Sequence, residues 1–326
     1  MKRTRPKLAL ILQLTPAMKL RREAFTPALI VTLLTALNCR HAQIPLPSGP
    51  KATGGDTTAT RGEYIVRNVA VCGQCHAADP QHDVDGPLSG GTEFRDWRIG
   101  TSRAANLTSD TATGLLTWSE AEIVRALRNG QRKDGRLLAP VMPYEWFHEM
   151  SDDDAFAVAR YLKSLRPVRH EVSQSPNFVF KLGKLLFLSP KAPISASAPP
   201  RGATVEYGGY LAQHVGLCAD CHTPRGGILA KPDKSRLFAG DAHPPKDFPA
   251  NPSNLTPDTA TGIGQWSETD FLQTLRTGKN PAGVSLHSFM PWREIRRMSD
   301  EDLRAMYRYL RTVPPIRNEV PRRAEQ

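Results

Sequence analysis

The chain has 326 residues, of which 40% are hydrophobic, and this length suggests two or three domains. Its formal charge is +11, but residues 1–42 hold eight basic residues against Glu23 alone and so account for +7. The remaining +4 forms no basic stripe, and the sequence contains no nucleotide-binding loop or hydrolase triad, so we expect no nucleic-acid partner and neither of those enzyme classes.

The first 42 residues are typical of an export signal. A basic segment at 19–22 precedes the apolar run 25–37, which has about 13 residues and is too short to span a bilayer comfortably. We therefore expect residues 1–42 to be a signal peptide with an N-terminal extension, and Met18 to be the true start. Cys39 is expected to leave with the signal, and lipidation of this cysteine is the alternative.

The strongest motif in the chain is CxxCH, which occurs at 72–76 and again at 218–222. Two cysteines on one helical turn can each bond a haem vinyl group, and the adjacent histidine then lies against the iron. We therefore predict two covalently bound haem c groups. A zinc site or a disulfide would use the same cysteines, but a histidine directly after each pair favours haem. The predicted attachment residues are Cys72, Cys75, Cys218 and Cys221, and the predicted iron ligands are His76 and His222.

The sequence around this motif is duplicated. The offset between matching residues is 146 at the cysteines and 148 further along, so the copies differ by two residues in the loop after CxxCH. Matching strings are Asn-Leu-Thr at 106–108 and 254–256, Trp-Ser at 118–119 and 266–267, Met-Pro at 142–143 and 290–291, and Arg-Tyr-Leu at 160–162 and 308–310.

We expect an all-α fold in which each copy wraps three helices and long loops around a haem. A capping box predicts the start of the second helix, glycine predicts its end, and an acidic first turn marks the last helix. The expected starts are Gly62 and Gly208 for the first helix, Ser119 and Ser267 for the second, and Ser151 and Ser299 for the last, with Gly130 and Gly278 ending the second. The predicted domains are 55–168 and 205–316, with a linker at 169–204 and a polar tail at 317–326.

The linker contains a conspicuous apolar piece at 178–188, followed by a proline-rich segment that predicts a stiff tether. The apolar piece is too short to cross a membrane. One interpretation is a hydrophobic strap packed between the two haem units. The other is a docking patch for a partner subunit or for peripheral contact with a membrane surface.

Two matched methionines in each copy compete to be the sixth iron ligand. Met150 and Met298 each precede a helix-capping serine, where an apolar residue commonly packs on the first turn. Met142 and Met290 lie in loops and are each followed by proline, which would hold them rigidly and leave the sulfur free to face an iron. We therefore predict Met142 and Met290 as the distal ligands.

Trp118 and Trp266 follow the Asn-Leu-Thr loop at equal spacing in the two copies. Each is expected to be a core aromatic, or to aim its indole N–H at a haem propionate while Asn106 or Asn254 fixes the loop; both roles are compatible. Six further histidines have no histidine at the matching place of the other copy and are expected at the surface, namely His82, His148, His170, His214, His243 and His287.

These strings make the chain similar to class I cytochrome c domains, and more narrowly to the cytochrome subunits of bacterial alcohol, gluconate and related periplasmic dehydrogenases. The resemblance covers roughly residues 55–165 and 205–315. It implies histidine/methionine-ligated haems in the bacterial periplasm that pass electrons from a catalytic subunit to quinone or another acceptor. The chain itself is then not expected to be an enzyme. Many such subunits carry three haems and a C-terminal membrane association, which we do not expect here.

Two alternative functions are compatible with the same residues. A free dihaem shuttle to a terminal oxidase differs only in its partner. A dihaem peroxidase needs one haem that can free its distal site, which the matched methionines disfavour.

Overall fold

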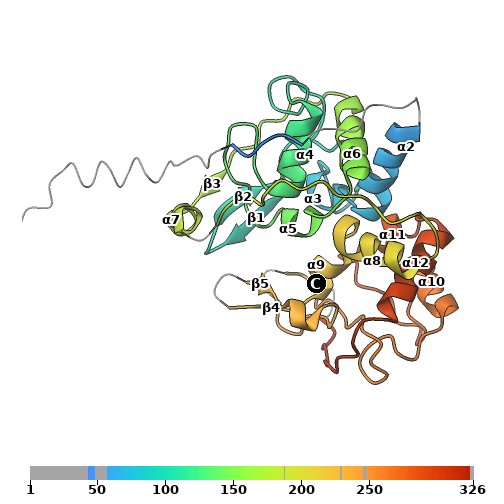
Figure 1. Ribbon diagram of the computed structural model, residues 1–326. Helices are drawn as coiled ribbons and strands as arrows, with labels where there is room; N and C mark the ends of the chain where they lie inside the picture. The colour runs from blue at the N-terminus through green and yellow to red at the C-terminus, as the bar shows by residue number, and fades with distance from the viewer. Residues whose placement is uncertain (1–42, 48–56, 187, 228–229, 245–247, 324–326) are drawn as a thin grey trace, which may run out of the picture. The chain divides into compact units, whose positions relative to one another are not determined.

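The computed structural model describes residues 43–47, 57–186, 188–227, 230–244 and 248–323, so the predicted export signal, including Met18 and Cys39, lies outside the described residues. The two copies follow the same helical order (Figure 1). The first copy and the linker contain α2 (Thr57–Tyr64), η1 (Ile65–Val69), α3 (Gly73–His76), β1 (Glu93–Asp96), β2 (Gly100–Arg103), α4 (Glu120–Asn129), α5 (Tyr144–Phe147), α6 (Asp152–Ser164), β3 (Ser175–Pro176) and α7 (Phe178–Leu186). The second copy contains α8 (Val205–Tyr210), η2 (Leu211–Val215), α9 (Cys218–His222), β4 (Arg225–Gly226), β5 (Lys231–Pro232), η3 (Lys234–Arg236), α10 (Glu268–Thr277), α11 (Trp292–Ile295) and α12 (Asp300–Leu310).

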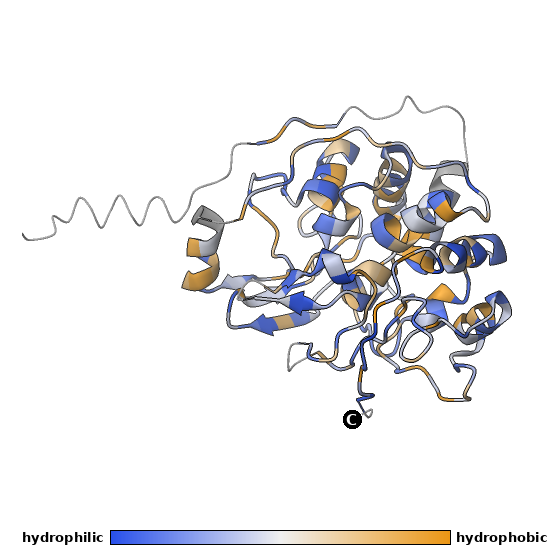
Figure 2. Ribbon diagram, turned by 60° about the horizontal axis from the view of Figure 1, so that its bottom comes forward, coloured by the Kyte–Doolittle hydropathy of each residue, from blue (hydrophilic) through white to orange (hydrophobic). Residues whose placement is uncertain are grey.

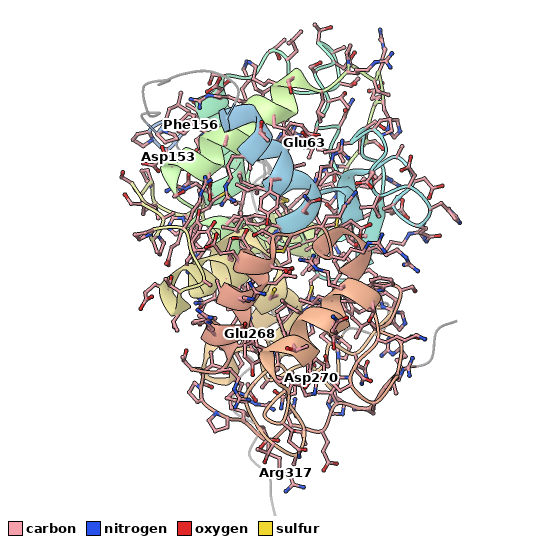
Figure 3. The ribbon with its side chains drawn as sticks, turned by 90° about the vertical axis from the view of Figure 1, so that its right-hand side faces the viewer. Glu63, Asp153, Phe156, Glu268, Asp270 and Arg317 are labelled. Carbon is pink, nitrogen blue, oxygen red and sulfur yellow. The ribbon has the colours of Figure 1, made fainter. Side chains whose placement is uncertain are left out.

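The predicted starts and ends of the later helices are confirmed. Ser119 and Ser267 form capping boxes at α4 and α10, and the boxes with Glu122 and Asp270 each make both of their hydrogen bonds. Gly130 and Gly278 end these helices in the left-handed conformation, at φ 73° and 71°, which glycine adopts without steric cost. Acidic residues line the first turns of α6, α10 and α12, where the helix dipole favours negative charge, as Glu268 and Asp270 show in Figure 3.

The first helix of each copy differs from its prediction. It begins earlier, at Thr57 and Val205, and it does not run unbroken into the motif. Each helix widens into the π-helical turns η1 and η2 before the chain turns into α3 and α9. The bend in the first copy places Val71 at a φ of 45°, and in the second copy Gly216 is extended. A stretch of apolar side chains predicts a helix there but carries no signal for the change of helical pitch.

Short strands accompany the helices, and they do not contradict the prediction of an all-α fold. β1 and β2 form a hairpin in the loop after the first motif, with Glu93 opposite Arg103, and β3 from the linker pairs with β2. A smaller pair, β4 and β5, occupies the corresponding loop of the second copy. An ion pair between Glu93 and Arg103 ties the two strands of the first hairpin. Strands of two to four residues are too short for an alternating pattern to be recognised in sequence.

Within each copy, the first and last helices pack closely on one another, as α2 and α6 do in Figure 3. Glycine makes this approach possible. A Cβ atom on Gly62 would lie 2.1 Å from the carbonyl oxygen of Ala157, and one on Gly208 would lie 1.9 Å from that of Ala305. These two glycines, expected at the helix starts, instead lie where the helices touch.

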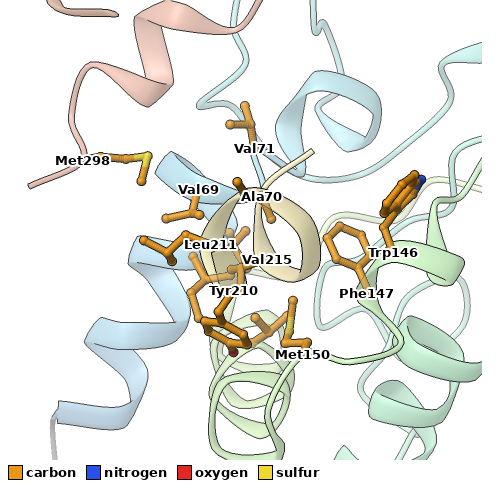
Figure 4. Packing of buried hydrophobic residues seen from close by; sticks show 14 of the residues in the cluster. Val69, Ala70, Val71, Trp146, Phe147, Met150, Tyr210, Leu211, Val215 and Met298 are labelled. Carbon is orange, nitrogen blue, oxygen red and sulfur yellow. The ribbon is translucent and has the colours of Figure 1, made fainter. Parts of the chain in front are cut away.

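The two copies share one hydrophobic core. η1 and η2 pack against each other, and Figure 4 shows Val69 and Val71 of the first copy beside Leu211 and Val215 of the second. Met150 and Met298, which are not predicted to bind iron, contribute to this shared core, since both are almost fully buried in it (Figure 4). The predicted packing role of these two methionines therefore extends to the contact between the copies.

Two tyrosines join the copies reciprocally. The Tyr210 hydroxyl donates to Asp154 Oδ2 at 2.7 Å and accepts from the Ser151 backbone N–H at 3.1 Å. Its counterpart Tyr64 makes the same pair of bonds, to Asp302 at 2.6 Å and from Ser299 at 3.0 Å. Burial and the neighbouring carboxylate raise the pKa of both tyrosines, so each hydroxyl remains protonated and continues to donate. Each copy therefore helps to cap the last helix of the other copy.

α7, the described part of the apolar piece, lies beside the hairpin of the first copy, so the interpretation of 178–188 as a strap packed between two haem units is wrong. α7 follows the strand that joins the β1–β2 hairpin, and Asn177 donates to the Trp97 carbonyl at 2.6 Å. The proline-rich segment is fixed along α4 and α6, where Asp152 N–H donates to the Ala196 carbonyl at 2.9 Å and Arg128 donates to the Ile194 carbonyl at 2.9 Å. None of the described helices is long and apolar enough to cross a membrane.

The tyrosine contacts generate a stability prediction. Tyr210→Phe leaves the buried Ser151 N–H without its acceptor, so we expect it to lower the free energy of unfolding by about 1–3 kcal/mol. Tyr309→Phe is the matched control, because the described residues offer its hydroxyl no hydrogen bond. Urea unfolding of the exported protein measures both variants, and equal stability of Y210F and Y309F would contradict the role assigned to this contact.

Candidate haem-attachment sites

Each CxxCH motif forms one short helical turn that presents both cysteines and the histidine. Cys72 is the residue before α3, which ends at His76, and α9 runs from Cys218 to His222. All four cysteines are free thiols, so the disulfide alternative has no support. Withdrawal from water raises the pKa of Cys72 to about 11 and those of Cys75 and Cys218 to about 12.

Both motif histidines are held in the form that binds iron. His76 Nδ1 lies 2.7 Å from the Ala105 carbonyl oxygen, and His222 Nδ1 lies 2.7 Å from that of Ser253. A carbonyl oxygen only accepts hydrogen bonds, so Nδ1 must carry the proton and Nε2 keeps its lone pair. Burial lowers the pKa of both histidines, which favours the neutral ring. A histidine oriented by its second nitrogen is the usual arrangement of a metal ligand.

The carbonyl that orients each histidine is itself held by the predicted asparagine. Asn106 is buried directly after Ala105, and its side chain donates to the Val168 carbonyl at 2.7 Å and to Thr113 Oγ1 at 3.0 Å. Asn254, directly after Ser253, makes the matching bonds to the Ile316 carbonyl and Thr261 Oγ1 at the same distances. The loop of each copy is therefore a rigid support for the histidine, and the asparagine acts on the histidine through the neighbouring peptide.

The predicted distal methionines lie in turns of matching geometry. Met142 N–H donates to the Ala139 carbonyl at 3.0 Å, and Met290 N–H donates to that of His287 at 2.9 Å. The following prolines have almost the same backbone angles, and both methionine side chains are partly buried against the core. Among the described residues, hydrogen bonds tie each motif histidine to the asparagine loop, and none ties it to the methionine turn of its own copy.

Trp118 and Trp266 are both partly buried against the core, as a core aromatic should be. Their backbone carbonyls accept hydrogen bonds from the last helix, from Lys163 Nζ at 2.6 Å and from the Tyr307 hydroxyl at 2.7 Å. The Arg132 guanidinium also lies 5.8 Å from the Trp118 ring centroid. These contacts support a role in fixing the helix entry, and the predicted reach of the indole N–H towards a propionate stays a prediction.

The surface prediction for the other histidines is correct for three of the six. His82, His170 and His243 are exposed, while His148, His214 and His287 are partly buried. His287 is the least expected of them. Its Nδ1 accepts the Phe289 N–H at 3.1 Å, and its buried Nε2 has no hydrogen-bond partner among the described residues. It lies on the methionine turn of the second copy, where the first copy has Ala139.

The residues present fit a covalently attached haem better than a zinc ion. Each motif offers two free thiols and an imidazole with a free Nε2. The described residues contain no group of three or more histidine, cysteine or acidic side chains that could hold a metal ion, so a zinc site finds no ligand set among them.

Comparison with known proteins gives the same assignment, although no family model matches the chain. It is 33% identical over 281 residues to the cytochrome c subunit of the quinone alcohol dehydrogenase of Gluconobacter oxydans, a match that covers 78% of this chain and 55% of the relative. It is 30% identical to the gluconate 2-dehydrogenase cytochrome c subunit of Pantoea cypripedii, over 79% of this chain and 60% of the relative. The chain thus spans little more than half the length of these dehydrogenase subunits.

A third relative matches over almost its full length. The chain is 30% identical to a dihaem cytochrome c-type protein of Cereibacter sphaeroides over 308 residues, which is 90% of this chain and 99% of the relative. From this match and the two attachment sites, the chain belongs to the family of c-type cytochromes that includes dihaem cytochromes c and the cytochrome c subunits of bacterial alcohol, gluconate and fructose dehydrogenases.

Proposed function

We propose that this chain is a dihaem electron carrier that accepts electrons from the catalytic subunit of a periplasmic dehydrogenase and passes them to quinone or a terminal acceptor. The observation that carries the proposal is the pair of oriented histidines, one in each CxxCH motif, whose Nε2 atoms are free to bind iron. Haem bound at these sites would supply one-electron redox chemistry. The remaining chemistry is assigned to a catalytic partner on another chain.

The proposed haem domains are residues 55–168 and 205–316, as two tandem class I cytochrome c domains joined by the linker 169–204 and followed by the tail 317–326. Each would hold one haem through its cysteine pair. The proposed iron ligands are His76 with Met142, and His222 with Met290. The chain is proposed to act in the periplasm after removal of residues 1–42.

A histidine and a methionine together leave an iron no open position for substrate, so such a site transfers electrons rather than making bonds. This feature separates the proposal from a dihaem peroxidase. The main alternative is a free dihaem shuttle to an oxidase. It is favoured by the full-length match to a relative named only as a dihaem cytochrome, whereas the named dehydrogenase subunits are longer. Copurification of the native protein with a catalytic subunit supports the dehydrogenase role, and isolation as a monomer supports the shuttle.

The surface around α7 supports a further contact, with the membrane. Trp97 is 64% exposed and Phe178 is 60% exposed, and the apolar side chains of Val179 and Leu182 continue this patch along the helix that is coloured hydrophobic in Figure 2. The exposed cations Arg95 and Lys181 lie on the same hairpin and helix. Exposed aromatic and apolar side chains beside basic residues are typical of a surface that rests on anionic lipid headgroups. We propose that this α7 patch binds the membrane surface.

Replacing the ligand methionines tests the electron-carrier proposal. Met142→Ala and Met290→Ala should each open one haem, increase its binding of carbon monoxide or imidazole, and lower its reduction potential, because a thioether favours ferrous iron. Visible spectroscopy and redox titration measure these effects. Unchanged spectra in both variants would rule out the proposed ligands, and rapid reaction of the half-reduced wild-type protein with hydrogen peroxide would favour the peroxidase.

Vesicle binding tests the α7 patch. The double variant Trp97→Ser/Phe178→Ser removes two large apolar anchors and should bind vesicles containing anionic lipid more than tenfold more weakly than the parent protein does. The control is Leu116→Ser/Val284→Ser, which removes two exposed apolar side chains elsewhere. Sedimentation with vesicles gives the affinities. A parent protein that stays in solution with anionic vesicles, or equal loss in both double variants, would contradict a membrane role for this patch.

A further inference from the structure

The third residue of each CxxCH motif makes a polar contact with the opposite copy. In the first motif this residue is Gln74, whose Nε2 donates to the carbonyl oxygen of Phe289 at 3.0 Å. Phe289 directly precedes Met290, and its own N–H donates to His287 Nδ1 at 3.1 Å. Its ring also meets that of Phe248 at 4.9 Å between centroids. The peptide that carries Met290 is therefore fixed on several sides, and one of these contacts comes from the attachment motif of the other copy.

The second motif makes the reciprocal contact. Asp220, the counterpart of Gln74, lies beside the Trp146 side chain, which lowers the pKa of the Asp220 carboxyl group against the larger opposite effect of burial. Trp146 lies on α5, four residues after Met142, and is buried. The Asp220 carboxylate is also paired with Arg225 in its own copy. Gln74 therefore reaches the backbone directly before Met290, and Asp220 lies beside a side chain four residues after Met142.

The packing of the helices agrees with these two contacts. η1, which leads into the first motif, packs on α11 directly after Met290, and η2 packs on α5 directly after Met142. Figure 4 shows Trp146 and Phe147 in this contact region, facing the shared core around Val215. The polar contacts are therefore part of a continuous and nearly symmetric interface.

Haem attachment does not explain the identity of these residues. The chemistry of CxxCH uses the cysteines and the histidine, and the third position is free to vary. In this chain the position holds Gln74 and Asp220, and in both cases the side chain reaches out of its own copy to a group beside a methionine turn. The partners of such a hydrogen bond lie in different copies, so the bond forms only when the two copies are packed together. It therefore links the two sites.

We propose that Gln74 and Asp220 are positioning residues, each of which holds the methionine turn of the opposite copy, so that the sixth ligand of each iron is fixed by the other copy's attachment helix. This inference rests on the proposed methionine ligation. It assigns a function to the duplication beyond carrying a second haem. Each site is completed by its neighbour, and a defect in one motif loosens the methionine of the other.

The distinctive test is an effect that crosses between the copies. Gln74→Ala should raise the affinity of imidazole for the second haem about tenfold, which corresponds to about 1.4 kcal/mol, while leaving the first haem unchanged. Asp220→Ala, in the second motif, should do the same at the first haem and not at the second. Gln81→Ala, at an exposed glutamine of the first copy, is the control and should change neither.

The two haems are distinguished by the methyl resonances of their axial methionines in the reduced protein, assigned with Met142→Ala and Met290→Ala. Gln74→Glu keeps the side-chain length but replaces the donor with an acceptor, so it tests the same bond in a variant of similar packing. The inference would be overturned if Gln74→Ala and Gln74→Glu disturb the first haem. It would also be overturned if they disturb neither haem. If neither haem shows the methyl resonance of an axial methionine, the proposed ligation itself is wrong, so the two failures are distinguishable.

Discussion

The hydrogen bond from each motif histidine to a loop carbonyl is the constraint on which the account of this protein depends. It fixes the proton on Nδ1 and the ring in one orientation, and so determines that Nε2 is the atom offered to a metal. The buried asparagine that follows the carbonyl keeps the loop in place through bonds to the end of its own copy. A small helical unit with little core of its own thereby holds a ligand in a single conformation.

The duplication adds a second set of constraints, which come from contacts between the two copies. The two copies are not independent units. The π-helical turns, the paired tyrosines, Met150 and Met298 all contribute to a shared interface. Hydrogen bonds also hold the proline-rich segment of the linker along the first copy. A redox protein with two sites benefits from such rigidity, since little reorganisation accompanies a change of charge at either site.

Helix starts and ends could be predicted from the sequence, because the residues that determine them are close together in the chain. The capping serines, the terminal glycines and the acidic first turns each act within one turn of the chain, so α4, α6, α10 and α12 could be located. The duplication supplied the comparison from which Met142 rather than Met150 is predicted as an iron ligand, and this choice stays a prediction. Features that depend on distant partners were missed. Ala105 and Ser253 act through backbone atoms, and Tyr64 and Gln74 reach groups more than 200 residues away. The short hairpin strands, the π-helical turns and the position of α7 carried no periodic pattern that sequence could reveal.

We propose that each CxxCH motif holds one covalent haem, which intact-mass spectrometry of the denatured, exported protein can measure. We expect a polypeptide that carries the mass of two haems after denaturation. We also expect that Cys72→Ala/Cys75→Ala and Cys218→Ala/Cys221→Ala each lose one haem. A bare polypeptide, or haem that is released when the wild-type protein is unfolded, would contradict the account.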